Sequence, residues 1–306
     1  MEIGIYNDLS HQDYLEAEGI SSSLLKELVF RSPAHAKAAM SGLRRKSSAA
    51  MTLGTIIHTA ILEPHKFEAI YWVAPRKDDV PDALATVQDM REAAASHGVS
   101  LKGLTKKEDI KAALVASGAQ VVFWDDLCEP PPGRQQITQD QYQAAMGAAE
   151  AVRSHPEAGP LLSNGSAEKS FFWKDQTGEL CKARTDYLHP NGLIVDLKTC
   201  EDARLYAAQR AMHQYHYDLS AAHYMEAIRN SGMQVNGFAW VFVETTAPYA
   251  VQVYLASDSM IARARRKMRE GLDYWSLCSI ADSWPAYTIE AQEIDLPAYA
   301  TGEYSE

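Results

Sequence analysis

The chain has few cysteines, and none are arranged as a pair: Cys128, Cys181, Cys200 and Cys278 are widely separated. Without a Cys-x-x-Cys motif, neither a zinc site nor a disulfide framework is indicated, and free thiols are favoured. No stretch approaches the ~20 consecutive apolar residues that a membrane span requires. The first residues lack the basic region and apolar run of a signal peptide. We therefore expect a cytoplasmic protein without a membrane partner.

The chain also lacks a general excess of positive charge. Its formal net charge of −11 argues against a surface that coats nucleic acid. Two local runs are nevertheless basic. Between Val29 and Leu62 no residue is acidic, and the positive residues there are Arg31, Lys37, Arg44, Arg45 and Lys46. The second run consists of Arg263, Arg265, Arg266, Lys267 and Arg269. Each run could grip phosphates, and each is equally well explained as a solvated helix face.

The length and composition indicate a folded globular chain. With 306 residues, of which 46% are hydrophobic and 23% charged, the chain can bury a substantial core. Residues 76–136 are polar and rich in alanine, and they close with a run of prolines. We expect residues 1–306 to form one domain, with 76–136 as an insertion within it.

Hydrophobic periodicity and turn residues predict an α/β fold with a mixed sheet. A three-stranded meander is expected over 168–199, and β-rich segments are expected over 237–245 and 250–256. The expected helices begin at Ser21 and continue beyond Pro33, and the later ones cover 52–63, 138–154, 202–210, 217–230 and 257–277.

Two acidic residues and a lysine surround the second turn of the meander. Pro190, Asn191 and Gly192 are strong hairpin residues. A hairpin centred on Asn191 places Asp186 opposite Asp196, so the two side chains share a face. Because strand side chains alternate with period two, Lys198 projects from the face of Asp196.

The same reasoning brings in Glu168 one strand upstream, since a hairpin centred on Thr177 places it opposite Asp186. Three neighbouring carboxylates repel one another, and oxygen-rich clusters suit hard divalent cations such as Mg²⁺ or Mn²⁺. A solvated hairpin face explains the spacing alone equally well. The strand around Asp196 is largely apolar, however, and a buried charged pair needs a cation or partner ions.

These residues resemble the PD-(D/E)xK nuclease superfamily and, within it, the RecE-type exonucleases (exonuclease VIII). The resemblance implies a nuclease core with a central mixed β-sheet flanked by helices, and it covers most of the chain outside 76–136. The blocks that carry it are Gly19–Ser23, Leu53–His58 with Leu62–Pro64, Glu168–Trp173, Gly178–Asp186, Val195–Thr199, Tyr217–Tyr224 and Trp284–Pro285.

The resemblance also implies roles for single residues. His58, Asp186, Asp196 and the backbone carbonyl of Leu197 would bind metal, with two Mg²⁺ ions per site that Mn²⁺ can replace. Lys198 would act on the attacking water, and Glu168 matches the upstream acidic residue. Without the resemblance, His58 on its apolar helix is better explained as a core histidine.

One position departs from the related nucleases. They usually have Gln in a Tyr-x-x-Gln-x-x-x-Tyr motif, whereas this chain has Ser220 between Tyr217 and Tyr224. The resemblance makes these three residues candidate DNA contacts, although both tyrosines could serve packing alone. The basic residues Arg44, Arg45 and Lys46 are further candidates.

The activity that the resemblance implies is processive 5′-to-3′ digestion of one strand of linear double-stranded DNA. The 3′ overhang would serve a single-strand annealing protein, and the enzyme would be a ring-shaped homo-oligomer such as a tetramer. Two alternatives stay open at this point. One is a structure-specific or restriction-like endonuclease with the same site, and the other is a catalytically silent DNA-binding scaffold of recombination.

Overall fold

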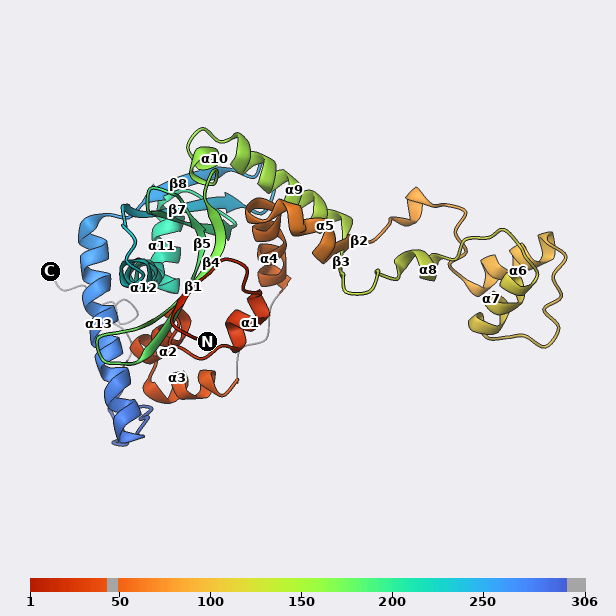
Figure 1. Cartoon of the computed structure of the whole chain (residues 1–306). Coiled ribbons are helices and arrows are strands. Elements are labelled where there is room, and N and C mark those ends of the chain that lie inside the picture. Colours follow the sequence, from red (N-terminus) through yellow and green to blue (C-terminus); the bar gives the residue numbers. More distant parts are fainter. Residues whose placement is uncertain (43–48, 296–306) are drawn as a thin grey trace.

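A computed structural model describes residues 1–42 and 49–295 of the chain. Its centre is a six-stranded sheet with strand order β1-β4-β5-β6-β7-β8 (Figure 1), in which only β6 and β7 run parallel. The strands are β1 (Gly4–Tyr6), β4 (Ser166–Lys174), β5 (Leu180–Leu188), β6 (Leu193–Cys200), β7 (Gly237–Glu244) and β8 (Val251–Leu255). The predicted mixed sheet with flanking helices is confirmed.

Nine helices of the described ranges accompany this sheet. They are α1 (His11–Glu16), α2 (Ser22–Phe30), α3 (Pro33–Met40), α4 (Ala49–Leu62), α9 (Gln139–Ser154), α10 (Ala158–Leu161), α11 (Leu205–Tyr215), α12 (Tyr217–Asn230) and α13 (Asp258–Ala281). Every predicted helix is present, but α11 begins three residues late. The Asp202 carboxylate accepts the Arg204 backbone N–H at 2.9 Å, and this local turn competes with helix formation. No helix of the described part is long and apolar enough to cross a membrane.

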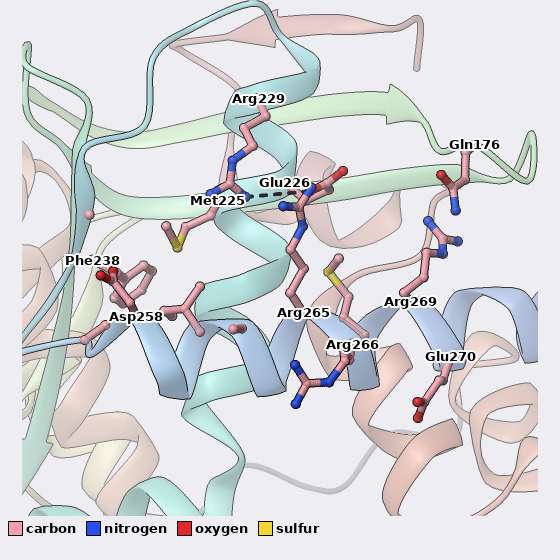
Figure 2. Close-up of a pocket in the computed structure, with 15 residues that line it drawn as sticks. Gln176, Met225, Glu226, Arg229, Phe238, Asp258, Arg265, Arg266, Arg269 and Glu270 are labelled. Atoms are coloured by element: carbon pink, nitrogen blue, oxygen red, sulfur yellow. Dashed lines mark ion pairs between the residues drawn. The ribbon is translucent and has the colours of Figure 1, made fainter.

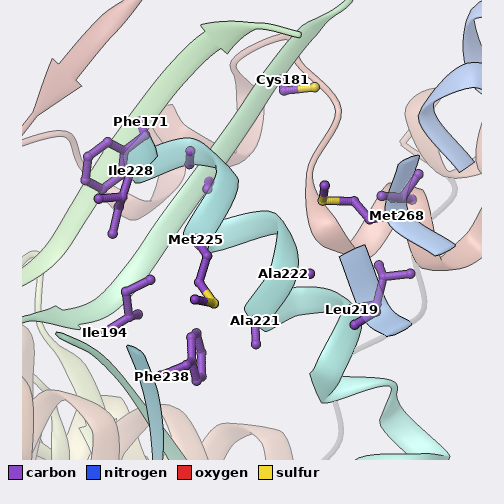
Figure 3. Packing of buried hydrophobic residues seen from close by; sticks show 14 of the residues in the cluster. Phe171, Cys181, Ile194, Leu219, Ala221, Ala222, Met225, Ile228, Phe238 and Met268 are labelled. Carbon is purple, nitrogen blue, oxygen red and sulfur yellow. The ribbon is translucent and has the colours of Figure 1, made fainter. Parts of the chain in front are cut away.

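Period-two alternation divides the sheet into two buried faces. Ile194 and Trp240 belong to a core that includes residues of α2, α12 and α13, and Figure 3 shows Ile194 and Phe238 beside α12. Val195 and Leu197 belong to the opposite core, which includes residues of α4 and α9. The central strands are therefore apolar on both faces, apart from the charged residues near their ends.

The meander has the predicted register. In the second hairpin, Tyr187 opposes Val195 and Leu188 opposes Ile194, as expected for a turn centred on Asn191. Gly192 adopts φ +85°, a conformation that glycine tolerates best. In the first hairpin, Ala167 opposes Tyr187, so that turn is centred on Thr177.

The segment from 76 to 136 projects from the sheet at the right of Figure 1. It leaves β2 (Tyr71–Val73) and returns to β3 (Gln135–Ile137), and these two strands pair in parallel. Its helices and those just before it are η1 (Pro64–Lys66), α5 (Phe67–Ile70), η2 (Lys77–Asp79), α6 (Val87–Ser96), α7 (Lys107–Ala116) and α8 (Trp124–Cys128). Met90, Ile110 and Leu114 form a separate small core there with Ala94 and Phe123.

Candidate active site

Strands β5 and β6 separate at the two aspartates. Backbone pairing continues to Tyr187 and Val195, and Asp186 and Asp196 come next in the same register. Here the Oδ2 of Asp186 accepts the backbone N–H of Leu197 at 2.8 Å. The carboxylate thus satisfies a backbone donor on the neighbouring strand. The opened ladder holds both carboxylates together.

Asp196 and Lys198 project from one face of β6, as predicted. The Lys198 Nζ lies 2.5 Å from Oδ2 of Asp196, whose exposed fraction is 4%. Burial raises the pKa of Asp196 to about 6, Lys198 opposes this change and Asp186 adds to it. Burial would lower the pKa of Lys198, but Asp196 and Asp186 outweigh it and hold this pKa above its ordinary value. Lys198 is therefore a firmly protonated cation between carboxylates.

The carboxyl group of Asp186 also has a raised pKa. Burial raises its pKa to about 6, and Glu168 adds to the increase, while Lys198 and the Leu197 N–H oppose it. The buried Asp196 and the half-buried Asp186 both have raised pKa values, and among the described residues Lys198 is the one cation paired with them, so the cluster attracts further positive charge.

Glu168 lies opposite Asp186 in register, between the pairs Ala167–Tyr187 and Lys169–Thr185. It adopts φ +53°, which is uncommon for a residue with a side chain. Its carboxylate forms an ion pair with Arg184, and the Arg184 Nη1 also donates to the Leu9 carbonyl at 2.7 Å. Arg184 therefore compensates Glu168.

His58 reaches the same strand from α4. This helix approaches β6 closely, because a Cβ placed on Gly54 would lie 3.0 Å from the Thr199 Oγ1. The His58 ring donates a hydrogen bond to the backbone of Leu197. Burial and then Lys198 lower the pKa of His58 to about 4, so the imidazole is neutral at pH 7. A neutral imidazole is the form that binds metals.

The donors around this cluster suit a divalent cation. Two carboxylates, a backbone carbonyl and a neutral imidazole come from Asp186, Asp196, Leu197 and His58, and oxygen-rich sets of this kind suit Mg²⁺ or Mn²⁺. Within residues 1–42 and 49–295, no three acidic, His or Cys side chains already converge as a ligand group. Lys198 instead neutralises Asp196, and the Leu197 carbonyl accepts from Lys198 at 3.3 Å. The donor chemistry fits, with Lys198 as the present counter-charge.

The three candidate contacts on α12 lie at different depths. The ring of Tyr217 faces the cluster, with the Lys198 Nζ 4.9 Å from its centre. Ser220 is 9% exposed. Tyr224 hydrogen-bonds the Ser22 side chain, and its ring lies 6.4 Å from that of Phe238. Tyr217 and Tyr224 are both half-buried and Ser220 is buried. Asp196 and Asp186 help to raise the pKa of Tyr224, so both tyrosines lie near the cluster.

A second lysine stands beside the cluster, and the sequence analysis did not identify it. The Nζ of Lys26, on α2, lies 5.7 Å from the centre of the Tyr217 ring. Burial lowers the pKa of Lys26 to about 8, Lys198 lowers it further, and Asp196 and Asp218 oppose the change. No pattern along α2 distinguishes Lys26 from a surface lysine, so only the fold identifies it.

The two basic runs have different outcomes. Arg44, Arg45 and Lys46 lie outside the described residues. In the second run, Arg265, Arg266 and Arg269 line a cavity of about 650 Å³ between α12 and α13 (Figure 2), away from the acidic cluster. Glu226 lies 3.3 Å from Arg265, and Asp273 lies 3.0 Å from Arg269, so carboxylates already compensate much of this charge.

Comparison with known proteins identifies the family. A family model, described as a PDDEXK-like domain of unknown function (DUF3799), matches residues 21–297. The chain belongs to this family. It is thus a member of the PD-(D/E)xK superfamily, as the motif predicted. No curated protein matches the sequence.

Solved structures add the fold. This chain is similar to a candidate exonuclease from Eubacterium rectale, with 13% identity and a TM-score of 0.58. The alignment covers 97% of this chain and 99% of the Eubacterium rectale chain. This similarity supports the shared fold. A phage-related exonuclease from Haemophilus somnus 129PT aligns over 87% of this chain and 97% of its own, with 12% identity and a TM-score of 0.31. That score is too low to establish a common fold.

Proposed function

We propose that the protein is a metal-dependent nuclease that hydrolyses DNA phosphodiesters, with Asp186, Asp196 and Lys198 at its centre. One observation carries the proposal. At the opened ladder between β5 and β6, the buried Asp196 and the half-buried Asp186 have raised pKa values, and in the described part of the chain they share one lysine, whose Nζ lies 2.5 Å from Asp196. A purely structural ion pair has no need of the second carboxylate, whereas a cation site does.

The residues have separate tasks in this mechanism. A divalent cation held by Asp186, Asp196, the Leu197 carbonyl and His58 supplies Lewis-acid activation of the phosphate and of water. Lys198, protonated because of its carboxylate neighbours, orients the attacking water and offsets negative charge that develops on the phosphate. The Leu197 N–H fixes the carboxylate of Asp186 in place. Glu168 is paired with Arg184, and its remaining influence helps to raise the pKa of Asp186.

The finer proposal is an exonuclease that needs Mg²⁺, with Mn²⁺ as a substitute, and holds two ions per site. It degrades one strand of linear double-stranded DNA from 5′ to 3′, as a ring-shaped homo-oligomer, and leaves 3′ overhangs for a single-strand annealing protein. The ordered RecE-like sequence blocks support this reading, and the structural neighbour from Eubacterium rectale is named as a candidate exonuclease.

Two DNA forms separate this proposal from its alternatives. With Mg²⁺ and a linear duplex labelled at one chosen strand end, we expect label release that identifies the degraded strand. Covalently closed circular DNA should stay intact, whereas a structure-specific or restriction-like endonuclease would nick it. Asp196→Ala should abolish cleavage, and Asp82→Ala, which removes an exposed carboxylate in the 76–136 segment, should not. If neither the linear nor the circular DNA is cleaved with Mg²⁺ or with Mn²⁺, the catalytically silent DNA-binding scaffold is the alternative that remains.

A further inference from the structure

Aromatic rings and positive side chains continue from the acidic cluster toward α13. The Tyr217 ring contacts two cations, with the Lys198 Nζ at 4.9 Å and the Lys26 Nζ at 5.7 Å from its centre. Tyr215 stacks on Tyr217 with ring centres 5.6 Å apart and planes at 28°. Tyr215 is 52% exposed, so one end of this stack opens to solvent.

The next residue extends the series in another direction. His216 adopts the left-handed φ of +51° at the junction of α11 and α12. Its ring lies parallel to that of Phe30, with centres 3.3 Å apart and planes at 4°. The Lys267 Nζ lies 4.9 Å from the centre of the Phe30 ring. A single junction thus connects Lys26, near the cluster, with Lys267 on α13.

Asp196 and Asp218 lie near Lys26, but the two lysines of this series have no ion-pair partner in the described part of the chain. The chain as a whole nevertheless carries a net charge of −11. Burial lowers the pKa of His216, Lys26 and Lys267 lower it further, and only Asp218 opposes them. Lys26 is partly desolvated and Lys267 is exposed, and an amine without an ion pair gains from an anion that a ligand supplies.

We propose that Lys26, Phe30, Tyr215, His216 and Lys267 form a binding track for single-stranded DNA that leads to Lys198. Unpaired bases stack on the exposed ring of Tyr215, and Lys26 and Lys267 contact successive parts of the phosphate backbone. This combination of aromatic platforms and cations is typical of single-strand binding sites. The inference rests on the proposed nuclease function, and it specifies that the strand is unpaired where it approaches the cluster.

A single strand suits the track better than a duplex. In a duplex the bases are stacked on one another, so the Tyr215 ring has no base face to contact, and the phosphates alone remain for the lysines. An acidic peptide would use the lysines as well, but it would gain little from the stacked aromatic rings. The two competing ligands therefore become outcomes of the test.

The test compares charge-neutral variants by the salt dependence of binding. Fluorescence anisotropy of a labelled single-stranded oligonucleotide is measured in EDTA over a range of salt concentrations. Each lost phosphate contact on a single strand changes the slope of log affinity against log salt by about 0.7, so Lys26→Gln/Lys267→Gln should flatten it by about 1.4. The matched control is Lys102→Gln/Lys106→Gln, two exposed lysines of the projecting segment, and its slope should equal that of the native chain.

Two further variants keep the test independent of folding. Lys26→Arg/Lys267→Arg retains both charges and should restore the native slope. Tyr215→Ala should lower single-strand affinity by at least about five-fold, the lower end of what one stacked base contributes. Tyr274→Ala, which truncates another exposed tyrosine on α13, should leave that affinity unchanged.

Several outcomes would overturn the track. These are an unchanged slope in the double Gln variant, an equal effect on blunt duplex binding, or polyglutamate that competes as well as the oligonucleotide. Failure of the proposed function looks different, since the chain would then bind single strands through the track yet cleave no DNA with Mg²⁺ or Mn²⁺. Conversely, if the native chain cleaves DNA but the Lys26→Gln/Lys267→Gln variant has an unchanged salt slope, the proposed function stands and the proposed track is wrong.

Discussion

Replacing Asp196 by Asn should stabilise the metal-free protein at neutral pH. Burial raises the pKa of this carboxyl group from 3.8 to about 6. At pH 7 the Asp196 carboxyl group is ionised in both states, but its ionisation costs more free energy in the folded protein than in the unfolded chain. The difference of about 2 pKa units corresponds to about 3 kcal/mol of lost stability. Asn resembles the protonated acid and should recover about this amount.

The opposing effect is the lost ion pair with Lys198, and burial should outweigh it. The pKa of about 6 already includes the attraction of Lys198, so the net cost of ionisation remains after the pair is counted. Lys198 also keeps Asp186 as a neighbour. Because the folded pKa is raised, the native carboxyl stabilises the fold below its unfolded pKa of 3.8, and this stability is lost as pH rises through about 6. The advantage of Asn should therefore shrink to about 1 kcal/mol at pH 4.5.

Urea unfolding in EDTA, followed by the fluorescence of the six tryptophans, measures this difference at pH 7.0 and pH 4.5. Asp82→Asn removes an exposed carboxylate and should change the free energy of unfolding by less than about 0.5 kcal/mol. Adding Mg²⁺ or Mn²⁺ should stabilise the native chain more than Asp196→Asn, since ligand binding favours the state that holds it. If Asp196→Asn is no more stable than the native chain at pH 7.0, the conclusion that ionised Asp196 destabilises the metal-free fold is wrong.

Four further changes test the site and its support. Lys198→Ala should lower the cleavage rate at least ~100-fold, because transition-state charge loses its donor, while calorimetry shows metal binding retained; loss of metal binding as well would contradict this. His58→Ala should weaken Mn²⁺ affinity about ten-fold or more in calorimetry. Gly54→Ala should weaken it indirectly, because the added Cβ would push α4 away from β6. Adding Thr199→Ala to that variant should restore the affinity, because it removes the Oγ1 that the new Cβ meets. Replacing 80–134 by a Gly-Ser linker should leave cleavage of linear DNA within about two-fold in a rate assay, since that segment has its own core.

The hairpin face could be predicted because its causes are local. Turn residues fix where the chain reverses, and period-two alternation then fixes which side chains share a face. Asn191 and Gly192 therefore determined that Asp186 opposes Asp196, and the pairs beside them have that register. The point at which the β5–β6 ladder ends was harder to predict from the sequence, since it depends on the Asp186 carboxylate accepting a hydrogen bond from the Leu197 N–H.

Residues brought in from distant helices could not be predicted in this way. Lys26 reaches Tyr217 only because α2 and α12 pack in the same core, and nothing in the spacing of α2 shows this. Arg184 is a different case. It lies two residues before Asp186, so alternation already placed both on one face of β5, and its pairing with Glu168 could have been inferred from the predicted register.

Charge balance shows why the cluster depends on an added cation. Arg184 pairs with Glu168, so the remaining carboxylates are Asp186 and Asp196, and within residues 1–42 and 49–295 Lys198 is the one cation paired with them. Lys26 does not complete the balance, because it forms no ion pair within the described residues and Lys198 lowers its pKa. The excess negative charge is concentrated where the strands diverge and where Leu197 and His58 add two neutral donors. A divalent cation would relieve the repulsion at that point, and the scissile phosphate would then meet positive charge from the cation and from Lys198.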